Sequence, residues 1–197
     1  MMPDARIFIY LQKLRTGFSF MQIILANAKI MNSKWETAVP ITTEPRFKRE
    51  AEAFARELAT LSVEELAAIL NCNHKIAAEN RLRFQSFTVK DELVPAILAY
   101  NGQAYKYLKA SGFNAEDFTF AQQHLFILSF LYGMLRPLDL IHPYRLEERS
   151  QLLSAHGDRL TDFWKPRLTN ALITAAKADD GILLHLATEE YEHLFDW

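Results

Sequence analysis

The sequence predicts an α/β fold in a single domain, on three observations. Gln22–Ala26 is a short apolar run of strand length, and a second run of that kind, Ile182–Ala187, lies near the C-terminus. Between them lie segments whose apolar residues recur every three or four positions, as on one face of a helix. The chain has 197 residues, of which 50% are hydrophobic and 23% charged, so it can bury a sizeable core.

Three helices are expected in the first half of the chain. The first lies within Pro45–Thr60, where Phe47, Ala51, Phe54 and Leu58 share one face. Ser62 begins the second, because Glu65 three residues later completes a capping box. Asn73 can cap the third, which we expect to run through Phe84.

The sequence of the second half of the chain predicts one long central helix. Pro95 suits the first turn of a helix, and Asn114 with Asp117 then forms a capping-box-like start. The helical repeat that follows consists of Phe118, Ala121, Leu125, Leu128, Tyr132 and Leu135. Because Pro137 prevents continuation, this helix should end at about Leu135.

The last predicted elements are a helix and a strand. Asp158 or Thr161 can begin a helix that carries Trp164, in which Pro166 is tolerated only early. Ile182–Ala187 then predicts a buried strand.

Composition limits the functional classes. The 22 basic and 24 acidic residues nearly cancel, so attraction to a polyanion requires charges gathered on one face. A single cysteine, Cys72, cannot form an internal disulfide, which predicts a reducing, cytoplasmic compartment. The apolar run Ile7–Leu11 is far shorter than the roughly 20 residues that span a bilayer.

A motif within residues 120–147 carries a family resemblance. It runs from Phe120–Leu125 through Leu128–Asp139 to Pro143–Glu147, with a thinner match from Met21 to about Tyr191. The chain resembles the YaaA-type peroxide stress proteins. That resemblance implies a mixed β-sheet surrounded by helices and a cytoplasmic protein that acts in the response to hydroperoxide. It also implies non-specific binding to DNA backbone phosphates, which would help to limit oxidative, iron-linked DNA damage.

The resemblance also predicts where the domain begins and ends. The family's usual opening matches from Met21, so residues 1–20 are expected to be an upstream extension and residues 21–197 the domain. Relatives continue past the match with further strands, so we expect a domain incomplete at its C-terminus. Phe195 and Trp197 could then partly cover an exposed strand at Ile182–Ala187.

Candidate DNA contacts follow from basic residues and from the family pattern. They are Lys29, Asn80, Arg83, Gly133, Arg136 and Arg145. Arginine can hold a phosphate with two hydrogen bonds. The alternative is structural, because Asp139, Glu147 and Glu148 can pair with the arginines. Relatives are described as having a helix-hairpin-helix element, for which the Leu131–Met134 turn is our candidate.

A second basic cluster surrounds Arg83. It contains Lys75, Arg81, Arg83 and Lys90, with Phe84 and Phe87 beside it. Such residues can contact a backbone and stack on bases, but the same pattern is typical of a solvated helix face with a buried aromatic side.

A small-ligand or enzymatic cleft is the competing interpretation, and an inactive fragment is a third. Glu190 and His193 form one Glu-x-x-His pair, whereas carboxylate-bridged iron sites need two. Gln103 stands where relatives carry an acidic residue after Gly102, which weakens an enzymatic prediction. We therefore expect no metal, no cofactor and no catalytic residue, and a binding protein rather than an enzyme. A ligand cleft would be supported if Lys29, Asn80, Arg83, Arg136, Arg145 and Glu190 converged in one pocket.

Overall fold

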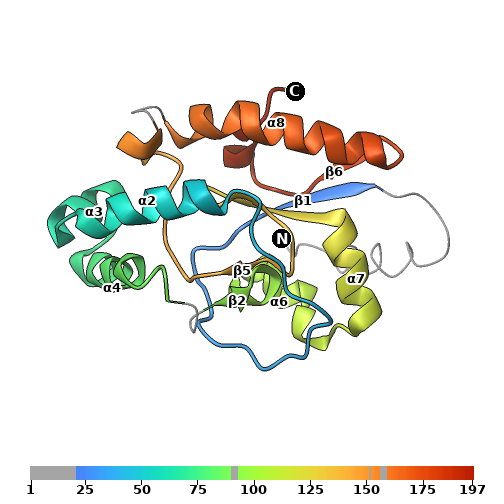
Figure 1. The fold of residues 1–197 in the computed structure, drawn as a ribbon, viewed down its shortest axis with the longest axis horizontal. Coiled ribbons are helices and arrows are strands. Elements are labelled where there is room, and N and C mark those ends of the chain that lie inside the picture. Colours follow the sequence, from blue (N-terminus) through green and yellow to red (C-terminus); the bar gives the residue numbers. More distant parts are fainter. Residues whose placement is uncertain (1–20, 90–92, 151, 156–158) are drawn as a thin grey trace.

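The computed structural model describes residues 21–89, 93–150, 152–155 and 159–197 (Figure 1). The predicted extension over residues 1–20 lies outside the described residues, as do Lys90 and the alternative helix start at Asp158.

A four-stranded sheet with the order β4-β3-β1-β6 forms the centre of the fold. Its strands are β1 (Gln22–Ala26), β3 (Leu125–Ser129), β4 (Gly133–Leu135) and β6 (Leu183–His185). β1 runs parallel to β3 on one side and to β6 on the other, while β4 is antiparallel to β3. The carboxyl ends of β1, β3 and β6 therefore meet at one edge of the sheet.

Helices surround this sheet, which confirms the predicted α/β class. They are α2 (Lys48–Thr60), α3 (Val63–Ile69), α4 (His74–Gln85), α5 (Ala96–Ala99), α6 (Gln103–Leu108), α7 (Ala115–His124) and α8 (Leu160–Ala178). Short 3-10 turns occur at η3 (Ala110–Gly112), η4 (Leu153–Ala155) and η5 (Glu189–Leu194). A small antiparallel sheet pairs β2 (Val94–Pro95) with β5 (Leu140–Ile141).

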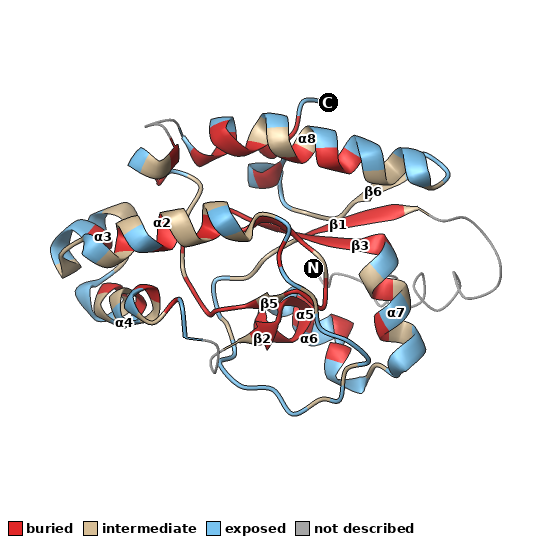
Figure 2. Cartoon of the chain, viewed as in Figure 1, coloured by how far each residue is buried: buried red, intermediate tan, exposed pale blue. Residues whose placement is uncertain are grey.

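The layers can be followed in Figures 1 and 2. α8 runs along one side of the central sheet, and β2, β5 and α6 lie on the other side. β1 and β3 are buried between these layers, and α8 turns its buried residues inward. The sheet is thus shielded from water on both faces, which is the usual condition of parallel strands.

The helix starts predicted at Ser62, Asn73 and Asn114 are confirmed, whereas the last helix begins at Leu160, after Arg159. Ser62 Oγ accepts from the backbone N–H of Glu65, and Asn114 Oδ1 accepts from that of Asp117, each within a capping box. The Asn73 side chain likewise caps α4.

The long helix predicted from Asn114 to about Leu135 is wrong. α7 ends at His124, and the following apolar run forms β3, a three-residue turn and β4. All residues of β3 and β4 are buried. A strand buried on both faces is apolar throughout, so its sequence pattern matches that of a buried helix equally well.

The Leu131–Met134 turn is therefore the bend of a β-hairpin and not part of a helix-hairpin-helix element. Ser129 Oγ accepts from the backbone N–H groups of Leu131, at 3.2 Å, and Tyr132, at 2.8 Å, and so holds the bend. The indole Nε1 of Trp164 donates to the Phe130 carbonyl at 2.8 Å, which attaches α8 to the same bend.

Gly133 is required by this packing. Its φ of +70° lies in the left-handed region, and a Cβ added there would come within 2.7 Å of the Trp164 ring. A side chain at this position would thus be strained in its backbone and would collide with a fully buried indole. The packing gives Gly133 a structural role, whereas the sequence predicted a DNA contact.

The C-terminal strand is shorter and less buried than predicted. β6 covers Leu183–His185, and all three residues are half-buried. In the described part of the chain it pairs with β1 alone. Phe195 is buried, and the Trp197 ring lies 5.5 Å from that of His185, so the final residues pack beside β6.

The Gly133→Ala substitution is expected to lower the free energy of unfolding by about 2–4 kcal/mol, from left-handed strain together with overpacking against Trp164. Urea denaturation followed by tryptophan fluorescence measures the change. Gly112→Ala is the control, because no atom lies within 4 Å of its added Cβ; it should change stability by less than about 0.5 kcal/mol. Equal effects of the two variants would contradict this account of Gly133.

A candidate anion cleft at the carboxyl edge of the sheet

A cavity of about 210 Å³ lies at the carboxyl edge of the sheet. Four segments line it: residues 26–29 after β1, Phe130 after β3, the loop residues 144–147, and Thr188, Glu190 and Tyr191 after β6. We call this cavity the carboxyl-edge cleft. In open parallel sheets this edge is the usual place for ligands, because loops from neighbouring strands converge there.

The exit of β1 into the cleft is fixed by Gly102 and Tyr105. Tyr105 donates its hydroxyl to the Ala26 carbonyl at 2.8 Å. A Cβ on Gly102 would come within 2.8 Å of the Ala28 Cβ, so glycine permits this close approach. Gln103 begins α6 and is exposed, outside the lining of the cleft.

Buried hydroxyl groups form the floor of the cleft. Asn27 donates from Nδ2 to the Tyr144 hydroxyl at 3.1 Å and accepts from the Tyr191 hydroxyl at 2.6 Å. The Tyr144 oxygen also lies 2.6 Å from Ser129 Oγ and 3.0 Å from the Tyr100 hydroxyl. Burial raises the pKa of both Tyr144 and Tyr191, so these phenols stay neutral. The role of Asn27 was missed from the sequence, where no local pattern distinguishes this residue.

One carboxylate bridges two cations in the cleft. Glu147 Oε2 lies 2.9 Å from Lys29 Nζ, and Glu147 Oε1 lies 2.8 Å from Arg145 Nη2. The Lys29 side chain is 60% exposed, whereas those of Arg145 and Glu147 are only 21% and 19% exposed. Two cations held on separate loops around one small cavity can bind an anionic group.

The structure brings together only some of the predicted site residues. Lys29 and Arg145 meet in the cleft, together with Glu190. Asn80 is buried on α4, where its Nδ2 donates to the Ile76 carbonyl at 2.8 Å. Arg83 pairs with Glu79 one turn earlier on α4 and lines a separate depression on that helix.

In the described part of the second basic cluster, the basic residues are exposed or half-buried and the aromatic rings are buried. Lys75 is exposed, and Arg81 donates from Nε to the Leu61 carbonyl at 2.8 Å. Phe84 and Phe87 are buried, so neither ring is available for stacking on bases.

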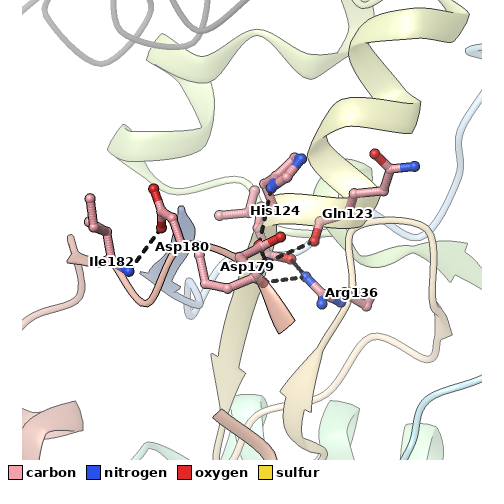
Figure 3. A network of polar contacts seen from close by, with 8 residues as sticks. Gln123, His124, Arg136, Asp179, Asp180 and Ile182 are labelled. Atoms are coloured by element: carbon pink, nitrogen blue, oxygen red, sulfur yellow. Dashed lines mark hydrogen bonds and ion pairs between the residues drawn. The ribbon is translucent and has the colours of Figure 1, made fainter. Parts of the chain in front are cut away.

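Arg136 lies near His124 and Asp179 (Figure 3), at the amino ends of β1 and β3, although the sequence predicted a phosphate contact. Its Nη1 donates to Gln22 Oε1 at 3.1 Å and to the Leu125 carbonyl at 3.2 Å. The guanidinium carbon lies 3.5 Å from the centroid of the Phe126 ring. Gln22 in turn donates to Asp179. This hydrogen bond joins the start of β1 to the C-terminal end of α8. Burial lowers the pKa of Arg136 to about 10, which leaves it charged at neutral pH.

Asp139 supports this junction from the turn after β4. It accepts from the Arg136 backbone N–H at 2.7 Å and from the Thr43 hydroxyl at 2.6 Å. Burial nevertheless raises the pKa of this carboxyl from 3.8 to about 6, because desolvation outweighs these hydrogen bonds.

Metal and thiol chemistry find no support in the described residues. No group of three or more His, Cys, Asp or Glu side chains there could hold a metal ion. Burial raises the pKa of the Cys72 thiol, which disfavours the reactive thiolate. Among the described helices, none is both long and apolar enough to cross a membrane.

Comparison with known proteins gives a consistent result. A family model described as peroxide stress protein YaaA matches residues 21–197. A UPF0246 protein of Bacteroides thetaiotaomicron is 43% identical over 178 residues, which are 90% of this chain and 69% of the relative. A UPF0246 protein of Crocosphaera subtropica is 39% identical over 175 residues, covering 88% of this chain and 70% of the relative.

The raised pKa of Asp139 predicts a pH dependence of stability. Because the folded state holds this proton more tightly than the unfolded state, the contribution of Asp139 is complete below about pH 4 and is lost as pH rises through about 6. The loss should total roughly 3 kcal/mol for a shift of about two units. Urea unfolding of the wild type and of Asp139→Asn at pH 4.5 and pH 7 measures it: the wild type should lose more stability than the variant. Equal losses would contradict the raised pKa.

Proposed function

We propose that this chain, which belongs to the peroxide stress protein YaaA family, binds DNA without sequence preference by holding backbone phosphates at the carboxyl-edge cleft. The observation that carries the proposal is the convergence of Lys29 and Arg145 on one cavity. Binding would help to limit oxidative, iron-linked damage by covering the bound DNA.

The geometry favours a phosphate ligand for two reasons. Arg145 presents a planar guanidinium, whose donors match two oxygens of a phosphate, and Lys29 adds a mobile point charge. The cleft also receives loops from three strands, so the two cations are held by separate segments of chain and can grip one group from different directions.

The structure favours a contact that reads no bases. Lys29 is the most exposed charge of the ion-pair cluster and can reach a phosphate at the rim of the cleft. Lysine and arginine contacts to phosphate position a protein on a duplex but carry no sequence information. Since the formal net charge is −2, the attraction must be local, and few phosphates can be engaged at once.

A second candidate is a small anionic ligand inside the same cleft. The cavity of about 210 Å³ and its neutral floor of Asn27, Tyr144 and Tyr191 favour it. Such a ligand would be nearly buried, so its affinity should depend little on salt, whereas duplex binding should weaken steeply as salt rises.

The test is a titration of fluorescently labelled duplex DNA with the wild type and with a Lys29→Ala, Arg145→Ala double variant at several salt concentrations. The double variant should bind at least about tenfold more weakly. Its plot of log affinity against log salt should become shallower by roughly one, because the two cations hold one phosphate together.

Arg83→Ala is the control, because it removes the same kind of charge from α4, outside the cleft. Its affinity should stay within about twofold of the wild type. Equal weakening by Arg83→Ala and the double variant would indicate a diffuse electrostatic effect and contradict a site at the cleft. Absence of DNA binding by the folded wild type would favour the small-ligand candidate.

A further inference from the structure

We infer that Glu147 is an internal counter-ion that occupies the place of the ligand's anionic group, and that a phosphate binds by displacing it. This inference rests on the proposed phosphate site and adds its regulation: the unliganded cleft is masked by its own carboxylate.

The Glu147 carboxylate lies where a bound phosphate would lie. Its two oxygens are divided between two cations, with Oε2 on Lys29 at 2.9 Å and Oε1 on Arg145 at 2.8 Å. A phosphate held by the same cations would place two of its oxygens in the same positions. The Glu147 side chain is only 19% exposed, so this carboxylate lies within the site and not on open surface.

Arg145 keeps an unused donor in this arrangement. Glu147 engages Arg145 through Nη2, while Arg145 Nε is buried and has no hydrogen-bond partner among the described residues. Glu147 Oε1 also has no hydrogen-bond partner among the described residues, because its close contact with Arg145 Nη2 lacks hydrogen-bond geometry. Buried polar groups are rarely left unpaired. A tetrahedral phosphate can accept from both the Nε and Nη2 donors of Arg145 while a further oxygen contacts Lys29. The Glu147 carboxylate does not make all three of these contacts.

Glu147 also cancels the charge of the cleft from a loop without regular secondary structure. Among the residues that line the cleft, Lys29 and Arg145 are balanced by Glu147 and Glu190, so the site has no net attraction for an anion while Glu147 stays in place. Residues 142–147 form an irregular loop without helix or strand. Glu147 can therefore leave the two cations by rotating its side chain, without breaking regular structure.

The experiment compares the wild type with Glu147→Gln and with Glu148→Gln as the matched control. Glu148 is the next acidic residue, and the control removes the same charge one position away, outside the residues that line the cleft. Inorganic phosphate is the first probe, and its affinity is obtained from the rise in unfolding temperature with concentration. Labelled duplex DNA is the second probe.

Glu147→Gln should bind phosphate about tenfold more tightly than the wild type, whereas Glu148→Gln should change the affinity by less than about twofold. Unchanged or weaker phosphate binding by Glu147→Gln would overturn the inference. If phosphate binding tightens in this variant while DNA binds to no form of the protein, the counter-ion role stands and the proposal of DNA binding fails.

A measurement on the wild type keeps the inference testable if Glu147→Gln does not fold. The Nε–H signal of Arg145 in an NMR spectrum can be assigned by its absence in Arg145→Lys. Addition of phosphate should shift this signal, because the phosphate would take the free Nε donor. A signal that stays in place at saturating phosphate would show that Arg145 Nε is not part of the site.

Discussion

The parallel pairing of β1 with both of its neighbours is the constraint on which the structure depends. β1 is the strand that joins β3 to β6, and Ile24 at its centre is completely buried. A parallel strand cannot be paired through a tight turn, so long crossovers must carry the chain around the sheet each time. Those crossovers contain the helices, and they bring the loops after β1, β3 and β6 to a common edge.

The two ends of β1 have different roles: the amino end makes structural contacts and the carboxyl end lines the cleft. At the amino end, Gln22 is buried and joins Arg136 to Asp179, which ties the start of β1 to the end of α8. At the carboxyl end, Asn27 and Lys29 turn into a cavity. Arg136 contacts a ring face, the Leu125 carbonyl and the Gln22 side chain, whereas Lys29 keeps most of its exposure. A buried charge is tolerated only when it gains fixed partners, so Arg136 stabilises the fold. Lys29 is more exposed and can exchange its partner for another.

The floor and the rim of the cleft differ in how their side chains are held. The floor is a connected set of hydrogen bonds through Asn27, Ser129, Tyr100, Tyr144 and Tyr191, and buried networks of this kind fix side-chain positions when their members are paired. The rim is formed by loops whose charges contact one another across a small gap. A ligand would therefore meet a preformed surface and would exchange partners only among Lys29, Arg145 and Glu147, which keeps the cost of ordering low.

The sequence by itself determined the features that depend on neighbours in the chain. The α/β class, β1, the caps at Ser62, Asn73 and Asn114, and the starts of the helices after them follow from periodicity and local hydrogen bonding. Only the tertiary structure decided that the apolar run after His124 is a hairpin and not a helix, since burial on every side removes the periodicity that distinguishes the two. It also decided which arginine is structural: Arg136 and Arg145 look alike in the sequence, and the difference between them is the distance of each from the carboxyl edge of the sheet, which no local pattern encodes.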